Sequence, residues 1–171
     1  MIVIFVLVLL VRTPFAVFSG RVSKPELGDG GITVVNNLNA DVYAYSVSAV
    51  ESPLRLIAAK GGEYHELWHK TTNGTGVSIK ISTHCERQDI LQFEYSAVYP
   101  TVYWDISCID LRNDSTIIRE GFSALPNVPG CEPVVCEPGA WNCSEVYHKP
   151  PDNHAVRGCP IDTSVVLKIG W

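Results

Sequence analysis

Residues 91–107 read LQFEYSAVYPTVYWDIS, and apolar and polar side chains alternate on both sides of the Tyr99-Pro100 pair. Alternation with a period of two is typical of a β-strand that buries one face, whereas an amphipathic helix repeats about every 3.6 residues. Proline fixes the backbone in a turn and cannot donate a ladder hydrogen bond. The stretch therefore predicts two short strands joined by a tight connection.

The same pattern recurs along the chain. Further short segments rich in Val, Ile and Tyr occupy residues 32–37, 41–48, 76–82 and 164–170. Gly, Pro, Asn and Asp separate them, and these residues favour turns. Several strands with turn signals about every ten residues predict one all-β domain over residues 31–171, folded as an antiparallel β-sandwich. Residues 124–160 are rich in Cys and Pro and lack strand periodicity, so we expect a disulfide-rich loop region there.

The beginning of the chain predicts secretion. Residues 1–11, MIVIFVLVLLV, are apolar but too short for a bilayer span of about 20 residues. We expect a signal peptide over residues 1–19, with an uncleaved signal-anchor as the alternative, and a polar leader over residues 20–30. The 6 cysteines all follow the signal, which is typical of disulfides formed in an oxidising compartment. Three glycosylation sequons begin at Asn73, Asn113 and Asn142.

The charge balance narrows the range of expected binding partners. The chain has 13 basic and 18 acidic residues, with a formal net charge of −5, and no run of basic residues. Nucleic acid is therefore not an expected partner. No second apolar span follows the signal, so we expect no membrane association after its removal. We also expect no cofactor.

Residues 61–74, GGEYHELWHKTTNG, contain the pattern H-E-x-x-H at His65, Glu66 and His69. A zinc-dependent hydrolase carries this pattern on a helix, where both imidazoles reach one metal ion. Here glycines precede the motif and a Thr-, Asn- and Gly-rich run follows it, so we expect a strand. On a strand both histidines share one face and Glu66 takes the other. The alternatives are a metal-dependent hydrolase or a strand-borne metal site completed by His84; we expect surface histidines.

Several segments together resemble one known family. They are ITVVNNLNADVYAYS, the H-E-x-x-H stretch through STHC, LQFEYSAVYPTVYWDIS, GCEPVVC and GCPIDTSVVLKIG, in this order. Their order and spacing are similar to the thaumatin-like proteins, and most closely to the short fungal branch of antigenic, yeast-phase-specific secreted proteins. The resemblance implies a β-sandwich with a disulfide-rich excursion. The chain has far fewer cysteines than the plant members of the family.

The resemblance also bears on the disulfides. Cys131 and Cys159 match family positions that are bridged, which implies a bond between them. Cys85 and Cys108 each end a strand, and a short loop separates Cys136 from Cys143. The simplest pairing of the remaining cysteines is therefore Cys85 with Cys108 and Cys136 with Cys143.

The resemblance further implies an acidic cleft, built in the family from an arginine, a glutamate and aspartates. Asp105 matches one of these aspartates. The glutamate position is occupied by Gln92, although Glu94 points to the same face of the strand. Ser82 stands at the arginine position and Gln88 at a second aspartate position. Much of the family's constellation is thus replaced.

We expect from these observations a secreted fungal antigen or cell-wall protein that binds a carbohydrate such as β-1,3-glucan, or a host protein, without catalysis. The candidate binding residues are Asp105, Glu94, Tyr103 and Trp141. A weak β-1,3-glucan hydrolase that uses Asp105 and Glu94 is the alternative, since glycoside hydrolysis needs two carboxyl groups. A metal-dependent hydrolase is a further alternative.

Overall fold

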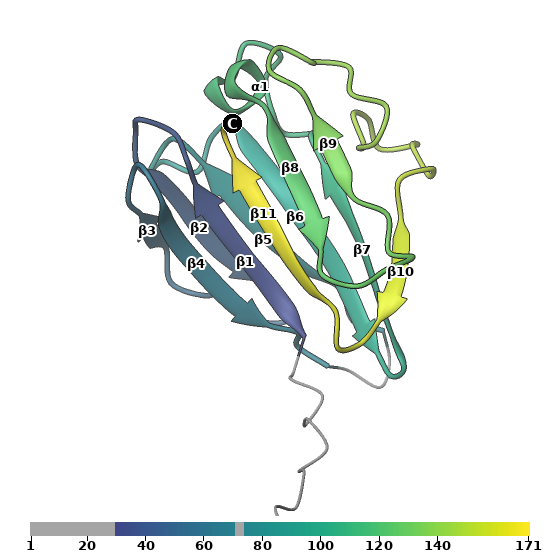
Figure 1. Ribbon diagram of the computed structural model, residues 1–171. Coiled ribbons are helices and arrows are strands. Elements are labelled where there is room, and N and C mark those ends of the chain that lie inside the picture. Colours follow the sequence, from purple (N-terminus) through teal and green to yellow (C-terminus); the bar gives the residue numbers. More distant parts are fainter. Residues whose placement is uncertain (1–29, 71–73) are drawn as a thin grey trace, which may run out of the picture.

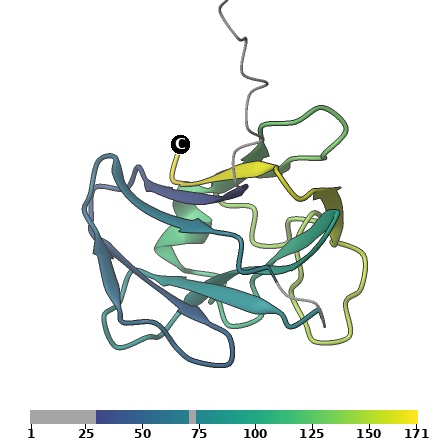
Figure 2. The ribbon, with the colours of Figure 1, turned by 90° about the horizontal axis from the view of Figure 1, so that it is seen from below.

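A computed structural model describes residues 30–70 and 74–171. The expected signal peptide, all but the last residue of the expected leader, and Asn73 lie outside the described residues. Within them, two β-sheets pack face to face, and Figure 2 shows the two layers end on. The predicted β-sandwich is confirmed.

The first layer is a five-stranded sheet in which the first and last strands of the domain are neighbours. Strands β1 and β11 lie side by side at its centre in Figure 1, and they run parallel, whereas the other pairs are antiparallel. The sequence predicted an antiparallel sandwich and gave no sign of this one parallel pair, because alternation shows which residues share a face but not which strands are neighbours. The strand order is β4 (Gly62–Leu67), β1 (Gly31–Asn36), β11 (Ser164–Ile169), β8 (Phe122–Pro126) and β9 (Val134–Cys136).

The second layer is a six-stranded antiparallel sheet that contains the stretch quoted first. The predicted strands within residues 91–107 are β6 and β7, and a cis Tyr99-Pro100 peptide lies in their connection. All neighbours in this sheet pair antiparallel. The strand order is β10 (Arg157–Pro160), β7 (Thr101–Ser107), β6 (Ile90–Val98), β5 (Val77–Ser82), β2 (Val42–Val47) and β3 (Arg55–Ile57).

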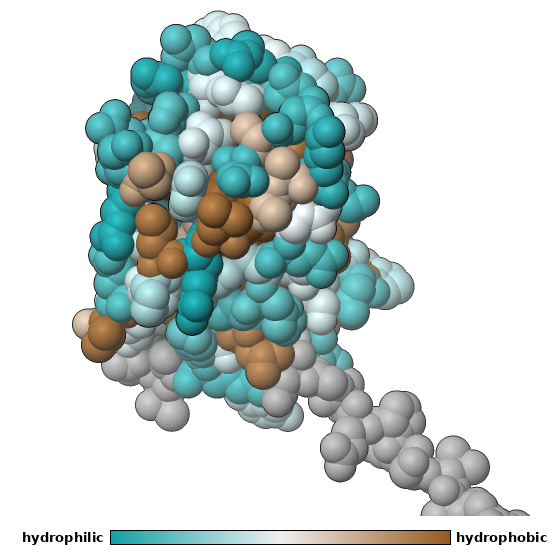
Figure 3. Space-filling model, turned by 90° about the vertical axis from the view of Figure 1, so that its left-hand side faces the viewer, coloured by the Kyte–Doolittle hydropathy of each residue, from teal (hydrophilic) through white to brown (hydrophobic). Residues whose placement is uncertain are grey.

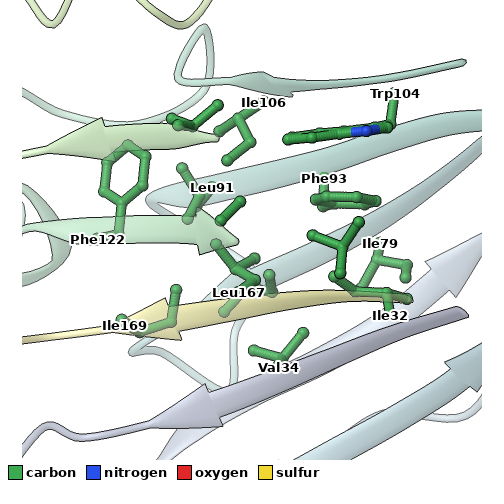
Figure 4. Close-up of a cluster of buried hydrophobic side chains, with 14 of the residues drawn as sticks. Ile32, Val34, Ile79, Leu91, Phe93, Trp104, Ile106, Phe122, Leu167 and Ile169 are labelled. Atoms are coloured by element: carbon green, nitrogen blue, oxygen red, sulfur yellow. The ribbon is translucent and has the colours of Figure 1, made fainter. Parts of the chain in front are cut away.

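The core fills the space between the sheets with the inward residues of both (Figure 4). Phe93 and Trp104 stack with ring centroids 5.4 Å apart. Ile32 and Leu167 come from the facing sheet and are fully buried. Each such side chain contributes about 1.5–3 kcal/mol through burial. On the side of β3 and β4, by contrast, small hydrophobic clusters are separated by hydrophilic residues (Figure 3).

The predicted loop region, residues 124–160, contributes more regular structure than its sequence suggested. It contains the end of β8 and the short strands β9 and β10, each of which adds to the edge of a sheet. Such short edge strands leave little room for a periodic pattern. The region holds two of the predicted disulfides, Cys131–Cys159 and Cys136–Cys143.

The third predicted disulfide is not formed, and Cys85 and Cys108 are free thiols. Cys85 lies in the exposed loop between β5 and β6, whereas the side chain of Cys108 is buried just after β7. The N–H of Cys108 donates to the carbonyl of Tyr147 in the loop region. Both cysteines follow a strand, as expected, but one side chain faces solvent and the other faces the core.

A single turn of helix, α1 (Thr116–Glu120), connects β7 to β8 and was not predicted. The Oγ of Ser115 caps it by accepting a hydrogen bond from the N–H of Ile117. In the described part of the chain, no helix has the length and apolar character needed to cross a membrane.

Candidate functional site

A groove opens on the outer face of the six-stranded sheet, away from the core. Its volume is about 590 Å³, which lies in the range that is usual for ligand sites. Strands β5, β6 and β7 supply most of its walls, and Val156 reaches it from the segment before β10. The lining residues are Val47, Ser48, Gly76, Val77, Ser78, Glu94, Tyr95, Ser96, Tyr103, Asp105 and Val156.

Strand register places three polar side chains of the groove in one row. Ser78 in β5 pairs with Glu94 in β6, and Glu94 pairs with Asp105 in β7. Directly opposite residues of an antiparallel pair share one face, with Cβ atoms about 4.5–5.5 Å apart. The two acidic candidates from the sequence are therefore neighbours across one strand pair.

Asp105 carries a buried oxygen without a hydrogen-bond partner. No described group donates to its Oδ1. Burial raises the pKa of Asp105 to about 7, and the charge of Glu94 adds to the rise, whereas Arg157 opposes it. Near neutral pH the side chain therefore alternates between a carboxylic acid, which can donate, and a carboxylate, which only accepts. A carboxyl group with a raised pKa and an unmet hydrogen-bonding position in a groove makes Asp105 a candidate ligand-binding residue.

Glu94 faces the same groove, whereas Gln92, two residues earlier in the chain, has a structural role. The Nζ of Lys80 donates to Oε1 of Gln92 over 2.5 Å, and Nε2 of Gln92 donates to Oδ2 of Asp110 over 3.0 Å. Burial raises the pKa of Glu94, Lys80 lowers it, and Asp110 raises it further. Glu94 therefore lines the groove, whereas Gln92, at the family's glutamate position, does not.

Arg157 joins the loop region to the sheet beside Asp105. Its Cζ atom lies 5.3 Å from the ring centroid of Trp104, within cation–π range. Its Nη1 donates to the carbonyl of Ala155 over 2.6 Å, and its Nη2 lies 3.5 Å from Oε2 of Glu145. Arg157 therefore fixes the segment that carries Val156 and supplies the positive charge that limits the rise in the pKa of Asp105.

The aromatic candidates from the sequence have separate positions. Tyr103 lines the groove opposite Ser96, and its side chain is 51% exposed. Trp141 is 56% exposed, but it lies within the loop that the Cys136–Cys143 disulfide closes and does not line the groove. The structure thus brings Glu94, Asp105 and Tyr103 together and leaves Trp141 apart.

His65 and Glu66 lie on strand β4, as predicted, whereas His69 follows the end of that strand at Leu67. Nδ1 of exposed His65 lies 3.2 Å from Oγ1 of Thr33 on the outer face. His69 was expected on that face too, but it lies beyond the end of β4, and its Nε2 lies 3.9 Å from Oε1 of buried Glu66. His84 is in the β5–β6 loop. Across residues 30–70 and 74–171, no group of three or more His, Cys, Asp and Glu side chains could hold a metal ion.

Glu66 instead forms a buried clasp between the two sheets. Its Oε2 accepts from the hydroxyl of Tyr64 over 2.6 Å, and its Oε1 accepts from Tyr95 over 2.8 Å and from Ser46 over 3.2 Å. Burial raises the pKa of both tyrosines and Glu66 adds to the rise, so both hydroxyls remain protonated donors. Since Glu66 belongs to β4 and the other two partners to β6 and β2, the clasp joins the layers.

Sequence reasoning missed several residues of the groove. Ser78 and Ser96 could have been found, because the period-two pattern of β5 and β6 places them on the outer face. Nothing in the sequence signalled Val156, which reaches the groove through the pairing of β10 with β7.

Comparison with known proteins identifies the family. The family model described as Blastomyces yeast-phase-specific protein matches residues 27–170. The chain belongs to this family. It is 39% identical over 146 residues to the secreted thaumatin-like protein calA of Emericella nidulans, covering 85% of this chain and 84% of the relative. It is 40% identical over 144 residues to the antigenic thaumatin-like protein of Arthroderma benhamiae, covering 82% and 72% of the two chains.

A solved structure shows the same fold. The protein elicitor MoHrip2 from Magnaporthe oryzae superimposes with a TM-score of 0.68 at 22% identity, covering 83% of this chain and 99% of that protein. The two relatives named thaumatin-like, at 39% and 40% identity, confirm the resemblance to thaumatin-like proteins. Like its relative in Emericella nidulans, this member of the yeast-phase-specific family is a secreted protein.

Proposed function

We propose that the protein binds a neutral polysaccharide, such as β-1,3-glucan, along the groove and does not cleave it. The row of Ser78, Glu94 and Asp105 carries this proposal. Its hydroxyl and carboxyl oxygens can accept hydrogen bonds from sugar hydroxyls, and protonated Asp105 can also donate. Tyr103 offers a half-exposed ring against which a sugar can pack.

The charge of the groove favours a neutral polymer over an acidic one. Glu94 and Asp105 lie beside each other, and the whole chain has a formal net charge of −5. Like charges would repel an anionic polysaccharide at close range. The groove runs across several strands, so a polymer has contacts along its length and not only at one sugar.

A depletion assay tests this proposal. Purified protein is mixed with insoluble β-1,3-glucan, with cellulose as the control polymer. We expect saturable loss from solution onto glucan, and about tenfold weaker binding for Glu94→Gln and Asp105→Asn, which corresponds to about 1.4 kcal/mol. Glu63→Gln, an exposed glutamate on the other sheet, is the matched control. Wild-type protein that stays in solution with glucan would refute the proposal and redirect the search to a host protein.

One observation favours hydrolysis as a second candidate function. Asp105, with a pKa of about 7, faces Glu94 across the strand pair, and glycosidases pair a proton-donating carboxylic acid with a second carboxylate. Release of reducing sugar from β-1,3-glucan by wild-type protein, but not by Asp105→Asn, would establish this activity. Binding without release leaves the groove as a binding site.

We further propose that the protein is N-glycosylated, that its signal peptide is cleaved, and that it is located in the cell wall. Asn113 and Asn142 are exposed, as an attached sugar requires. Treating the secreted protein with an amidase that removes N-linked glycans should lower its apparent mass, and N-terminal sequencing should begin near residue 20. Cell-wall fractions should contain the protein if the groove binds glucan there.

A further inference from the structure

A second candidate site lies on the opposite side of the sandwich, near the end of β11 that Figure 1 marks with C. Trp171 is 69% exposed there. Trp171 lines two hollows, of about 350 Å³ and 260 Å³. An exposed tryptophan that lines two hollows resembles a ligand platform more than a residue at the margin of the core.

The indole of Trp171 is held in place although it is exposed. A Cβ atom added to Gly121 would lie 2.4 Å from Nε1 of Trp171, so the edge of the ring packs directly on this glycine. The N–H of Gly170 donates to the carbonyl of Gly121 over 2.9 Å, and Nδ2 of Asn37 donates to the carbonyl of Gly170 over 3.2 Å. Gly170 has a φ of 86°, a conformation that favours glycine. The ring is thus positioned before any ligand arrives, which reduces the entropy cost of binding.

The larger hollow combines apolar and hydrogen-bonding groups. Leu125 and Val135 form its apolar wall, and each remains partly exposed. Lys168 and Ser123 pair across β11 and β8 and add an ammonium and a hydroxyl group. Glu120 lines the smaller hollow together with Trp171.

We propose that Trp171 and these hollows form a second carbohydrate site, whose ligand is an oligosaccharide of N-acetylated amino sugars. The indole face packs against a sugar ring. The methyl group of the acetamido substituent packs against the apolar wall of Leu125 and Val135. The carbonyl oxygen of the same substituent accepts a hydrogen bond from Lys168. A sugar without the acyl group leaves that wall in contact with water. The groove has the opposite character, since hydroxyl and carboxyl groups dominate its row, and this proposal does not rest on it.

Two β-1,4-linked oligosaccharides of equal length test the ligand: one of N-acetylglucosamine and one of glucose, which differ at the acetamido group. Calorimetric titration should show binding of the acetylated oligomer and at least tenfold weaker binding of the other. Trp171→Ala should weaken binding of the acetylated oligomer about tenfold or more, with an unchanged near-ultraviolet circular dichroism spectrum outside the tryptophan contribution. Leu125→Ser should reduce the preference for the acetylated oligomer by several fold.

Trp141→Ala is the matched variant, because Trp141 is a second exposed tryptophan. If Trp141→Ala abolishes binding and Trp171→Ala does not, the site is wrongly placed. Equal affinity for both oligosaccharides overturns the assignment of the ligand, and no binding of either overturns the site. If Trp171→Ala alters the fold, Leu125→Ser alone decides: an unchanged preference contradicts the proposal.

Discussion

Glu66 and Asp105 are two carboxyl groups in the same sandwich with opposite surroundings. Glu66 points between the sheets, and three hydroxyl groups donate to it. Asp105 points away from the core, yet its Oδ1 is buried without a donor. Burial is common to both, so burial alone does not mark a functional carboxyl group. The difference between the two groups is that Glu66 has its donors within the fold, whereas Asp105 lines the groove and has a buried oxygen without a donor.

The largest effect is expected for Glu66→Ala. The change leaves the hydroxyls of Tyr64, Tyr95 and Ser46 without their acceptor in a buried place. Leaving a buried donor unpaired costs about 1–3 kcal/mol, and three donors share this one acceptor. We therefore expect the free energy of unfolding, measured by urea denaturation, to fall by about 3 kcal/mol.

Glu63→Ala provides the matched control, because Glu63 is exposed on the same strand and faces the other way. Its effect should stay within about 0.5 kcal/mol, as is usual for surface substitutions. If both variants lose the same stability, the clasp does not join the sheets as described. Glu66→Gln should be intermediate, since the amide oxygen can still accept from the hydroxyls.

Asp105→Asn should raise the free energy of unfolding, by less than Glu66→Ala lowers it. This gain should appear only above acidic pH. The pKa of Asp105 in the folded protein is about 7, above the usual aspartate value of about 3.9. Between these values the folded state binds more protons than the unfolded state, so the free energy of unfolding falls as pH rises. The contribution is fully present below about pH 4 and lost as pH rises through about 7.

An asparagine cannot ionise, so the variant should avoid this loss. Relative to the wild type, Asp105→Asn should gain about 2 kcal/mol between pH 4 and pH 8, a value reduced from the full shift because the site is partly exposed. Urea denaturation at several pH values measures it. A difference between the two proteins that does not change with pH would show that Asp105 ionises like an exposed aspartate.

The sequence predicted the place of Asp105 in the fold, but it did not predict the hydrogen-bond partners of Glu66. Alternation along residues 91–107 placed Glu94 and Asp105 on strands, and the family resemblance singled out Asp105. For Glu66 the pattern predicted the strand and the side of the chain, but its partners come from β2 and β6. Period-two alternation shows which residues share a face, and it carries no information on which distant strands meet.

The same limit explains the errors. The parallel pairing of β1 with β11 depends on chain connections between sheets. Cys85 and Cys108 both follow strands, but side-chain direction beyond a strand end depends on the loop, and one thiol is exposed while the other is buried. Trp171 gave no signal, because the close approach of Gly121 that positions it involves residues far apart in the sequence.

The smallest changes in the free energy of unfolding are expected when a single tyrosine hydroxyl is removed from the clasp or from the groove. The hydroxyl of Tyr95 donates to Glu66 over 2.8 Å and accepts from the N–H of His69 over 3.2 Å. Tyr95→Phe therefore removes one buried and one partly buried hydrogen bond while the ring still fills its place. We expect a loss of about 1–1.5 kcal/mol in urea denaturation. Tyr103→Phe removes a hydroxyl from the exposed groove and should change stability by less than about 0.5 kcal/mol. Equal losses would mean that groove and clasp are held by similar interactions, and the distinction between an available and a structural carboxyl group would no longer hold.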